Sequence, residues 1–208
     1  MVRWGMAVDL TRCAGCQTCT IACKIDNETP PNVFWKSVRD VEIGSYPEVK
    51  RFFLPVQCMH CADPPCMDVC PTGATKKRDD GVVFIDYERC MGCGYCVLAC
   101  PYEARSLVKD ERSYFDGDGQ RAAGPRPLGA TTKCDLCFDR LDAGLGAGKR
   151  PGLDPEATPV CVNTCPARAV VFGDLDDPGS EVSKIVRTRE SFRLLPHMGT
   201  DPSVYYLW

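Results

Sequence analysis

The sequence predicts an α+β protein, rich in loops, that consists of two nested modules around a small apolar core. Three observations lead to this prediction. The 208 residues include 16 cysteines, which form four groups of four with none left over. The chain also contains 18 glycines and 17 prolines, residues that favour turns and loops. Hydrophobic residues make up 44% of the chain, but this fraction includes the cysteines, so other apolar side chains are scarce.

The four cysteine groups share a common spacing. Each group ends in two cysteines separated by three residues, and in three of the groups a proline follows the last cysteine. The first and third groups have the full pattern C-x2-C-x2-C-x3-C, whereas the fourth is divided by a gap of 23 residues. The groups are Cys13, Cys16, Cys19 and Cys23; Cys58, Cys61, Cys66 and Cys70; Cys90, Cys93, Cys96 and Cys100; and Cys134, Cys137, Cys161 and Cys165.

This spacing is typical of cubane iron–sulfur clusters. The run C-x2-C-x2-C-x3-C-P binds a [4Fe–4S] cluster, and its fourth cysteine ligates the other cluster in proteins with two clusters. Structural zinc sites use C-x2-C pairs, but not four groups that each end in C-x3-C. Eight disulfides are disfavoured because the cysteines are crowded and no export signal is apparent. The sequence therefore predicts four [4Fe–4S] clusters with every cysteine as a ligand.

The segment between the second and third groups predicts how the modules are arranged. Residues 71–86 contain short β-prone stretches on either side of Asp80-Gly81, which predicts a hairpin. Two cysteine groups joined by such a hairpin are typical of a two-cluster ferredoxin, so we expect residues 55–108 to form an inner ferredoxin-like module. Residues 1–54 and 109–208, with the first and fourth groups, would form an outer ferredoxin-like module nested around it.

The last cysteine of each group is expected to point away from its own loop and to ligate the cluster of a partner group. The crossing follows from the spacing, whereas spacing alone leaves the choice of partner groups open. Four predicted ligand sets result. Set one is Cys13, Cys16, Cys19 and Cys165; set two is Cys134, Cys137, Cys161 and Cys23; set three is Cys58, Cys61, Cys66 and Cys100; set four is Cys90, Cys93, Cys96 and Cys70.

A few other segments predict regular elements. Residues 34–56 are rich in Val, Phe, Trp and Tyr and predict two edge-like strands, interrupted at Pro47, that cover the clusters. Residues 138–144 predict a short helix beyond Cys137, and residues 181–187 predict another helix.

The remaining segments are expected to be connectors. Residues 116–129 form a polar Gly/Pro connector, and residues 144–159 form an inserted surface loop. The basic pair 149–150 in this loop is expected to be solvated rather than part of a docking contact. The apolar and aromatic tail 204–208 is expected to pack on this chain or on a partner, because a free apolar tail is unfavourable.

Single residues near the cysteines carry further expectations. His60 is expected to form a hydrogen bond or a packing contact rather than to act as a ligand, since four cysteines already serve each cluster. Lys133 either raises a cluster potential through its charge or is exposed, and both alternatives remain open. Residues 63–65, Asp-Pro-Pro, predict a rigid turn. No base, nucleophile or open metal position stands out, so we expect no catalytic residue and no activity other than electron transfer.

Several other functional classes are disfavoured by what the sequence lacks. It contains no apolar run of 18 or more residues, so no membrane-spanning helix is predicted. The formal charge of −3, with mixed signs, provides no basic surface for nucleic acid. The first ten residues contain neither a twin arginine nor an apolar segment with a cleavage site, so we expect no export signal in the chain.

The chain resembles the iron–sulfur electron-transfer subunit of the DMSO reductase family, in its polysulfide, thiosulfate and tetrathionate reductase branch. The four cysteine groups, residues 58–66 and 133–137, and the closing segment 202–207 carry this resemblance. It implies four cubane clusters, with groups one and four paired and groups two and three paired. It also implies a catalytic partner subunit that holds a molybdenum or tungsten bis-pterin, with the group-one cluster nearest to it. The gap between Cys137 and Cys161 is longer than usual for the family.

Two functional hypotheses follow. The first is a subunit that relays electrons between the catalytic partner and an integral membrane subunit that reacts with quinone, or another carrier. The alternative is a free polyferredoxin or an assembly factor that serves soluble oxidoreductases. The first hypothesis predicts a peripheral protein that associates with the membrane through its partners. It would lie on the cytoplasmic side, or on the periplasmic side after export with a twin-arginine partner.

Overall fold

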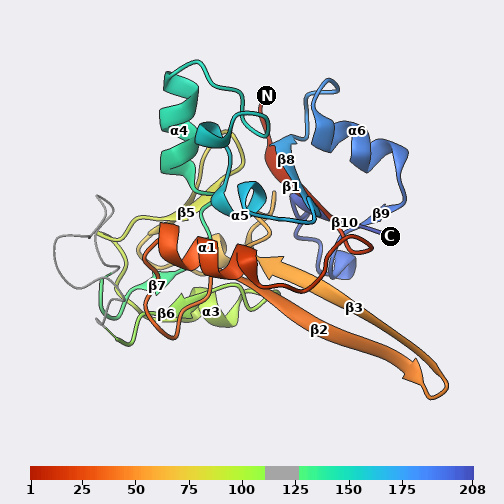
Figure 1. Ribbon diagram of the computed structural model, residues 1–208. Helices are drawn as coiled ribbons and strands as arrows, with labels where there is room; N and C mark the ends of the chain where they lie inside the picture. The colour runs from red at the N-terminus through yellow and green to blue at the C-terminus, as the bar shows by residue number, and fades with distance from the viewer. Residues whose placement is uncertain (111–126) are drawn as a thin grey trace.

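The computed structural model describes residues 1–110 and 127–208. The connector predicted for residues 116–129 lies outside these ranges, except for its last three residues. The largest sheet has four strands in the order β8-β1-β10-β9, and it joins the two ends of the chain (Figure 1). Its strands are β1 (Trp4–Asp9), β8 (Val170–Asp174), β9 (Ser191–Phe192) and β10 (Val204–Leu207). β1 runs parallel to β10 and antiparallel to β8.

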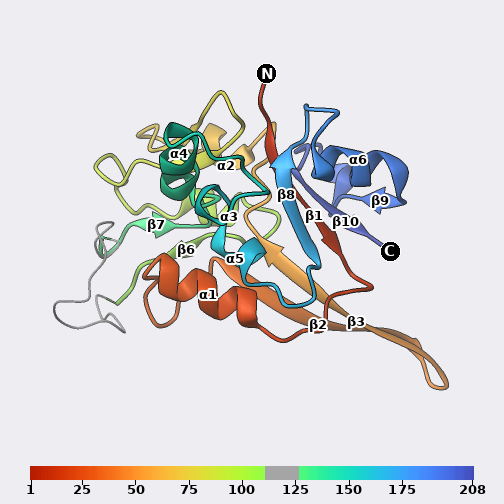
Figure 2. The ribbon, with the colours of Figure 1, turned by 45° about the horizontal axis from the view of Figure 1, so that its top comes forward.

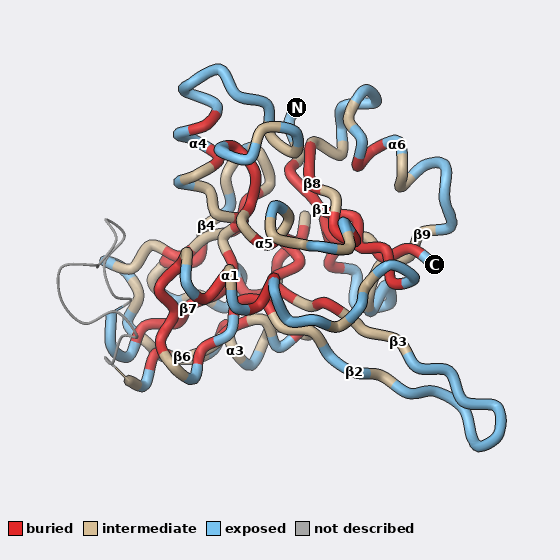
Figure 3. Tube along the Cα trace, viewed as in Figure 1, coloured by how far each residue is buried: buried red, intermediate tan, exposed pale blue. Residues whose placement is uncertain are grey.

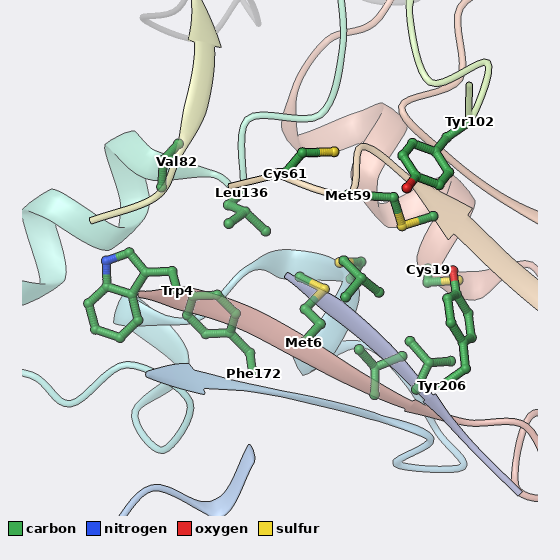
Figure 4. Packing of buried hydrophobic residues seen from close by; sticks show 14 of the residues in the cluster. Trp4, Met6, Cys19, Met59, Cys61, Val82, Tyr102, Leu136, Phe172 and Tyr206 are labelled. Atoms are coloured by element: carbon green, nitrogen blue, oxygen red, sulfur yellow. The ribbon is translucent and has the colours of Figure 1, made fainter. Parts of the chain in front are cut away.

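The sheet is buried on both faces, and its side chains alternate between two layers. Ala7 and Leu207 contact Val182 of helix α6 (Glu181–Thr188) on one face. On the other face, Met6 and Tyr206 belong to the main core together with cysteines of the metal-binding loops. Figure 4 shows this core, in which Cys19 and Cys61 lie among apolar side chains.

This sheet is the main feature of the fold that the sequence analysis did not predict. No strand was expected at β1 or β8, and the apolar tail was assigned only a packing role. The tail does pack on this chain, where it forms β10. It also reaches the second cysteine group, because the Ser203 hydroxyl donates to the carbonyl oxygen of His60 at 2.9 Å and the Tyr206 hydroxyl donates to that of Pro55 at 2.8 Å.

The two strands predicted within residues 34–56 are present as a long hairpin of β2 (Lys36–Ser45) and β3 (Glu48–Gln57), with Pro47 in its turn. The base of the hairpin packs on the main core through Val38, Phe52 and Leu54. Its far end projects into solvent, and Tyr46 at the tip is 93% exposed (Figure 3). The expectation that both strands cover the clusters is therefore wrong for the outer half of the hairpin.

Short elements connect the rest of the chain. The hairpin predicted within residues 71–86 is confirmed as β4 (Thr75–Lys77) and β5 (Val83–Ile85), and β6 (Ser106–Leu107) pairs with β7 (Thr131–Thr132). The helix predicted at 138–144 is α4 (Phe138–Gly146), and the one predicted at 181–187 is α6. Short 3-10 helices lie at Pro155–Ala157 and Pro196–Met198. No helix in the described ranges is long and apolar enough to cross a membrane.

The surface loop predicted at 144–159 is shorter than expected, because α4 continues to Gly146. The chain then folds back so that Ala157 is buried against Gly144, where a Cβ atom would lie only 2.4 Å from the Cβ of Ala157. Lys149 and Arg150 are exposed, as predicted.

Candidate metal centres

Four short helices organise the cysteine groups: α1 (Thr18–Asp26), α2 (Pro65–Asp68), α3 (Tyr95–Leu98) and α5 (Val160–Asn163). The third cysteine of each group is the second residue of its helix, where backbone N–H groups have no partner within the helix. The fourth cysteine lies one turn further along α1, or two residues beyond the end of the other helices. All four helices lie on the side of the large sheet opposite α6 (Figure 2).

Residues with positive φ curl the loops that precede these helices. Gly15 has φ 67°, and a Cβ atom there would lie 2.5 Å from the ring of Phe53. Gly92 has φ 73°, and its Cβ atom would lie 2.2 Å from the carbonyl oxygen of Gly129. Both positions therefore require glycine, for conformational freedom and for close approach of a neighbour.

Set one brings the first loop next to the end of the fourth group. Burial raises the pKa of the Cys13 thiol, and the charges of Cys19, Cys165 and Cys16 act on it in the same direction. The backbone N–H of Ala169 donates to Cys165 Sγ at 3.3 Å. The last cysteine of group four thus lies beside the first three cysteines of group one.

Set two is the most deeply enclosed. Burial raises the pKa of Cys23 well above its usual value, and Cys134, Cys161 and Cys137 add to this effect. The Nδ2 group of Asn27 lies 3.6 Å from Cys23 Sγ and 3.9 Å from Cys137 Sγ, and it donates to both. The last cysteine of group one therefore lies beside the first three cysteines of group four.

Set three lines one small pocket, which contains Cys58, Cys61, Cys66 and Cys100. Burial raises the pKa of Cys61 to about 12, with a further contribution from Cys58. Burial acts in the same direction on Cys58, but His60, Lys133 and Arg105 outweigh it, so the pKa of this thiol lies well below its usual value.

Set four lines a second pocket, which contains Cys70, Cys90, Cys93 and Cys96. Backbone N–H groups of Thr75 and Thr131 donate to Cys70 Sγ and Cys90 Sγ, each at 3.5 Å. Burial raises the pKa of Cys70, but hydrogen bonds from residues 72–75 outweigh this and lower it to about 7. These N–H groups form a concave anion site of the kind that favours a thiolate.

The four sets follow one another in space. Cys19 of set one acts electrostatically on Cys161 of set two. Cys58 of set three acts on Cys134 of set two. Cys66 of set three and Cys96 of set four share a buried contact cluster. The resulting order is one, two, three, four, and the exposed cysteines, Cys16 and Cys93, belong to the two end sets.

The donor chemistry of these sites fits a cubane cluster. All sixteen cysteines are free of disulfides. Thiols grouped in fours, with backbone N–H groups directed at sulfur, match the surroundings of an iron–sulfur cluster.

His60 and Lys133 both lie buried beside the cysteine sets. The Nδ1 atom of His60 accepts a hydrogen bond of 3.0 Å from the N–H of Val83, so the expected hydrogen-bonding role is confirmed. The ammonium group of Lys133 donates to the carbonyl oxygens of Val83 and Cys134. The alternative in which Lys133 is exposed is therefore wrong.

Several side chains that contact the cysteines were not among the predicted site residues, and Asn27 and Arg105 are the two that donate N–H groups to sulfur. Asn27 follows Cys23 by four residues, a spacing that places the two side chains on one face of a helix and could have indicated the contact. Arg105 donates to Cys66 Sγ at 2.9 Å across 39 residues of sequence. No local pattern signals that contact.

Comparisons with known proteins agree with this chemistry. Residues 49–116 match the model of a 4Fe-4S dicluster domain, and residues 10–29 match that of a 4Fe-4S binding domain. The chain is 41% identical to a proposed iron–sulfur subunit of the dimethyl sulfoxide reductase of Halobacterium salinarum, over all of this chain and 79% of the relative. It is 39% identical to a subunit of the selenate reductase of Mesobacillus selenatarsenatis and to a subunit of the tetrathionate reductase of Salmonella typhimurium. Each alignment covers 99% of this chain and 72% of the relative.

The fold and the cysteine sites define a [4Fe–4S] electron-transfer protein. The chain belongs to the family of iron–sulfur subunits that accompany the reductases of the DMSO reductase family. Its role is to transfer electrons, and the hypothesis of a free carrier is not favoured.

Proposed function

We propose that the chain holds four [4Fe–4S] clusters in a linear order and relays single electrons between two partner proteins. One partner is a catalytic subunit that carries a molybdenum or tungsten bis-pterin. The other is a membrane subunit that reacts with quinone, or another electron carrier. The substrate belongs to the catalytic partner, and the named relatives act in reductases of different substrates.

The observation that carries this proposal is the spatial order of the four cysteine sets. Sets two and three are largely buried, whereas sets one and four each contain one exposed cysteine. A relay needs ends that partners can approach and a middle that is shielded from water. The order of sets therefore suits transfer through the protein rather than reaction at a single site.

A bound [4Fe–4S] cluster supplies one-electron transfer with little change in geometry. The protein's own residues hold the thiolates in place, direct N–H groups at sulfur and exclude water. Through these contacts, together with nearby charges, the chain sets the reduction potential at each site.

The nested division of the chain forms part of the proposal. Sets three and four draw all their cysteines from residues 58–100, within the proposed inner module 55–108. Sets one and two combine residues 13–23 with 134–165, within the proposed outer module 1–54 and 109–208. Short contacts such as the hydrogen bond of 2.9 Å from Trp35 Nε1 to Thr132 Oγ1 join distant parts of the outer module.

Exposed apolar side chains near both ends support permanent partners. A free carrier is expected to keep such patches small, whereas a member of a stable complex buries them in its interfaces. We propose that the catalytic subunit docks at the set-one end and the membrane subunit or other carrier at the set-four end. The side chains concerned are Ile21, which lies on α1 two residues after Cys19 of set one, and Met91, Tyr95 and Leu98 near set four.

Isolation of the native complex tests this proposal. The affinity-tagged chain is expected to copurify with a partner that contains molybdenum or tungsten, in an assembly much larger than the 22.9 kDa chain. Recovery of the chain only as a monomeric species, with its clusters intact, would contradict the proposal.

A surface variant tests the set-four end separately. Leu98 is 86% exposed, and Leu98→Glu is expected to reduce tenfold or more the recovery of the membrane subunit, because a buried charge weakens an apolar interface. Leu153, which is 61% exposed in the loop after α4, provides the matched control. Leu153→Glu should leave recovery unchanged, and equal losses in both variants would argue against docking at the set-four end.

A further inference from the structure

Arg105 places a buried positive charge between two of the cysteine sets. Its side chain lies in the set-three pocket, and the residue is 4% exposed. The Nη2 group donates to Cys66 Sγ at 2.9 Å, and the Nη1 group donates to Thr75 Oγ1 at 3.1 Å. Both groups of the guanidinium are therefore engaged, one of them directly on a sulfur atom of set three.

The same side chain also reaches set four. The charges of Cys66, Cys58 and Cys96 all act on Arg105, and Cys96 of set four lies in the same buried contact cluster as Cys66. The second hydrogen-bond partner of Arg105, Thr75, lies in the set-four pocket and donates its backbone N–H to Cys70 Sγ at 3.5 Å. The guanidinium thus contacts set three directly and reaches set four through Thr75.

Within the described residues, Arg105 forms no ion pair with a carboxylate. A buried guanidinium without a counter-charge is strongly unfavourable. Among the residues that the structure describes, the charges that act on it are those of Cys66 and Cys58 of set three and Cys96 of set four. An arginine is suited to this position because its planar fork offers several donors in fixed directions and remains charged.

We propose that Arg105 is a positioning residue shared by two sites, which donates a hydrogen bond to sulfur in set three, reaches set four through Thr75, and raises the reduction potentials of the clusters at both sets. This inference rests on the proposed function, which assigns a cluster to each set. Hydrogen bonds to sulfur and a nearby positive charge stabilise the reduced form, which carries the additional negative charge.

Lys133 provides a control that distinguishes an effect on the reduction potentials of both clusters, at sets three and four, from an effect on the set-three cluster alone. It is buried like Arg105, and its charge acts on Cys58 and Cys66, both members of set three. Its ammonium group donates to two backbone carbonyls and not to set-four sulfur. Removal of the Lys133 charge should therefore shift the reduction potential of the set-three cluster and not that of the set-four cluster. Removal of the Arg105 charge should shift both.

Potentiometric titration followed by EPR, on the intact complex, tests the proposal. Each signal is first assigned with the ligand variants Cys61→Ser for set three and Cys93→Ser for set four. In Arg105→Gln, the equilibrium constant for reduction is expected to fall by about tenfold at both clusters, equivalent to about 59 mV for a one-electron couple. In Lys133→Gln, the set-three cluster should shift and the set-four cluster should not. A shift at one cluster alone, or at neither, in Arg105→Gln would overturn the proposal.

A conservative variant and a spectroscopic measurement extend the test. Arg105→Lys retains the charge and should restore part of the shift, whereas a purely steric role would give no rescue. Protein labelled with guanidino-¹⁵N arginine should show ¹⁵N hyperfine coupling at both reduced clusters, and Arg105→Lys should abolish it. This measurement on the wild-type chain remains decisive if Arg105→Gln loses its clusters. Absence of coupling at either cluster would overturn the proposal.

Iron analysis of the wild-type chain distinguishes failure of the inference about Arg105 from failure of the proposed function. If the iron content matches four clusters but Arg105→Gln shifts the reduction potential of neither the set-three nor the set-four cluster, the inference about Arg105 is wrong and the proposed function stands. If the wild-type iron content is far below four clusters, the proposed function itself is wrong.

Discussion

Individual side chains give each cysteine set a different electrostatic environment. Set three has His60, Lys133 and Arg105 around Cys58, and these groups favour the thiolate although the residue is buried. At Cys134 of set two the neighbouring charges act in the opposite direction. Burial raises the pKa of Cys134, and the carboxylate of Asp135 adds to that rise. The cysteine thiols of sets two and three thus lie in surroundings that favour the negatively charged thiolate to different extents.

Asn27 provides a residue-scale prediction for set two. Its amide donates to two sulfur atoms of that set, so Asn27→Ala should destabilise the reduced cluster there by roughly 0.5–1 kcal/mol, the usual contribution of a hydrogen bond. Redox titration should show a lower potential for that cluster and unchanged potentials for the other three.

The matched control is Asn163→Ala. Asn163 lies at the end of α5, beside the same set, but its amide donates to the carbonyl oxygens of Pro155 and Thr158 at 2.8 and 3.1 Å. Its removal should leave the potential of the set-two cluster unchanged. An equal shift in both variants would indicate that the effect is not due to donation to sulfur.

At the scale of elements, the repeated unit is a cysteine loop followed by a short helix. The sequence predicts these loops, the hairpin between β4 and β5, and helices α4 and α6, because each depends on local spacing or turn chemistry. It does not predict the large sheet. β1 is a short, continuously buried run without alternation, and its partners β8 and β10 are more than 150 residues away, so local patterning gives no indication of the pairing.

The crossing proposed for the fourth cysteines is consistent with how these helices pack. Helices α1 and α5 contact each other, which brings Cys23 beside the fourth group and Cys165 beside the first. Cys165→Ser should therefore damage the cluster proposed for set one and leave the set-two cluster intact at first. Mössbauer and EPR spectra of the purified variant provide the measurement.

Cys137→Ser is the reciprocal control, since Cys137 is assigned to set two. It should damage the set-two cluster and spare the set-one cluster. If Cys165→Ser instead removes the cluster that Cys137→Ser removes, then Cys165 shares a cluster with its own group and the crossing is wrong.

At the scale of the whole molecule, the large sheet holds the two ends of the chain together and supports the metal-binding loops. Its inner face contributes Met6, Val8 and Tyr206 to a core that also contains Cys19, Cys61 and Cys161. The C-terminal segment also stabilises the second cysteine group and the chain just before it, because Ser203 and Tyr206 donate hydrogen bonds to backbone carbonyl oxygens there. Apolar residues other than cysteine are scarce in the sequence, and in the structure the cysteines themselves form part of the core.

The crossing within the proposed ligand sets could be predicted from spacing, because the four groups repeat one pattern, whereas spacing alone left the choice of partner groups open. The linear order of the sets could not be predicted in this way, because it depends on contacts between groups, such as Cys19 with Cys161 and Cys58 with Cys134. The buried cations were missed for the same reason. Arg105 and Lys133 act on sulfur atoms far away in the sequence.

The central claim is that this chain holds four [4Fe–4S] clusters, one for each set of four cysteines. Chemical analysis of the anaerobically purified protein for iron and acid-labile sulfide tests it most directly. Four cubes of four iron and four sulfide ions predict about 16 of each per chain. A value near 8 of each, or stoichiometric zinc in place of iron, would contradict the account.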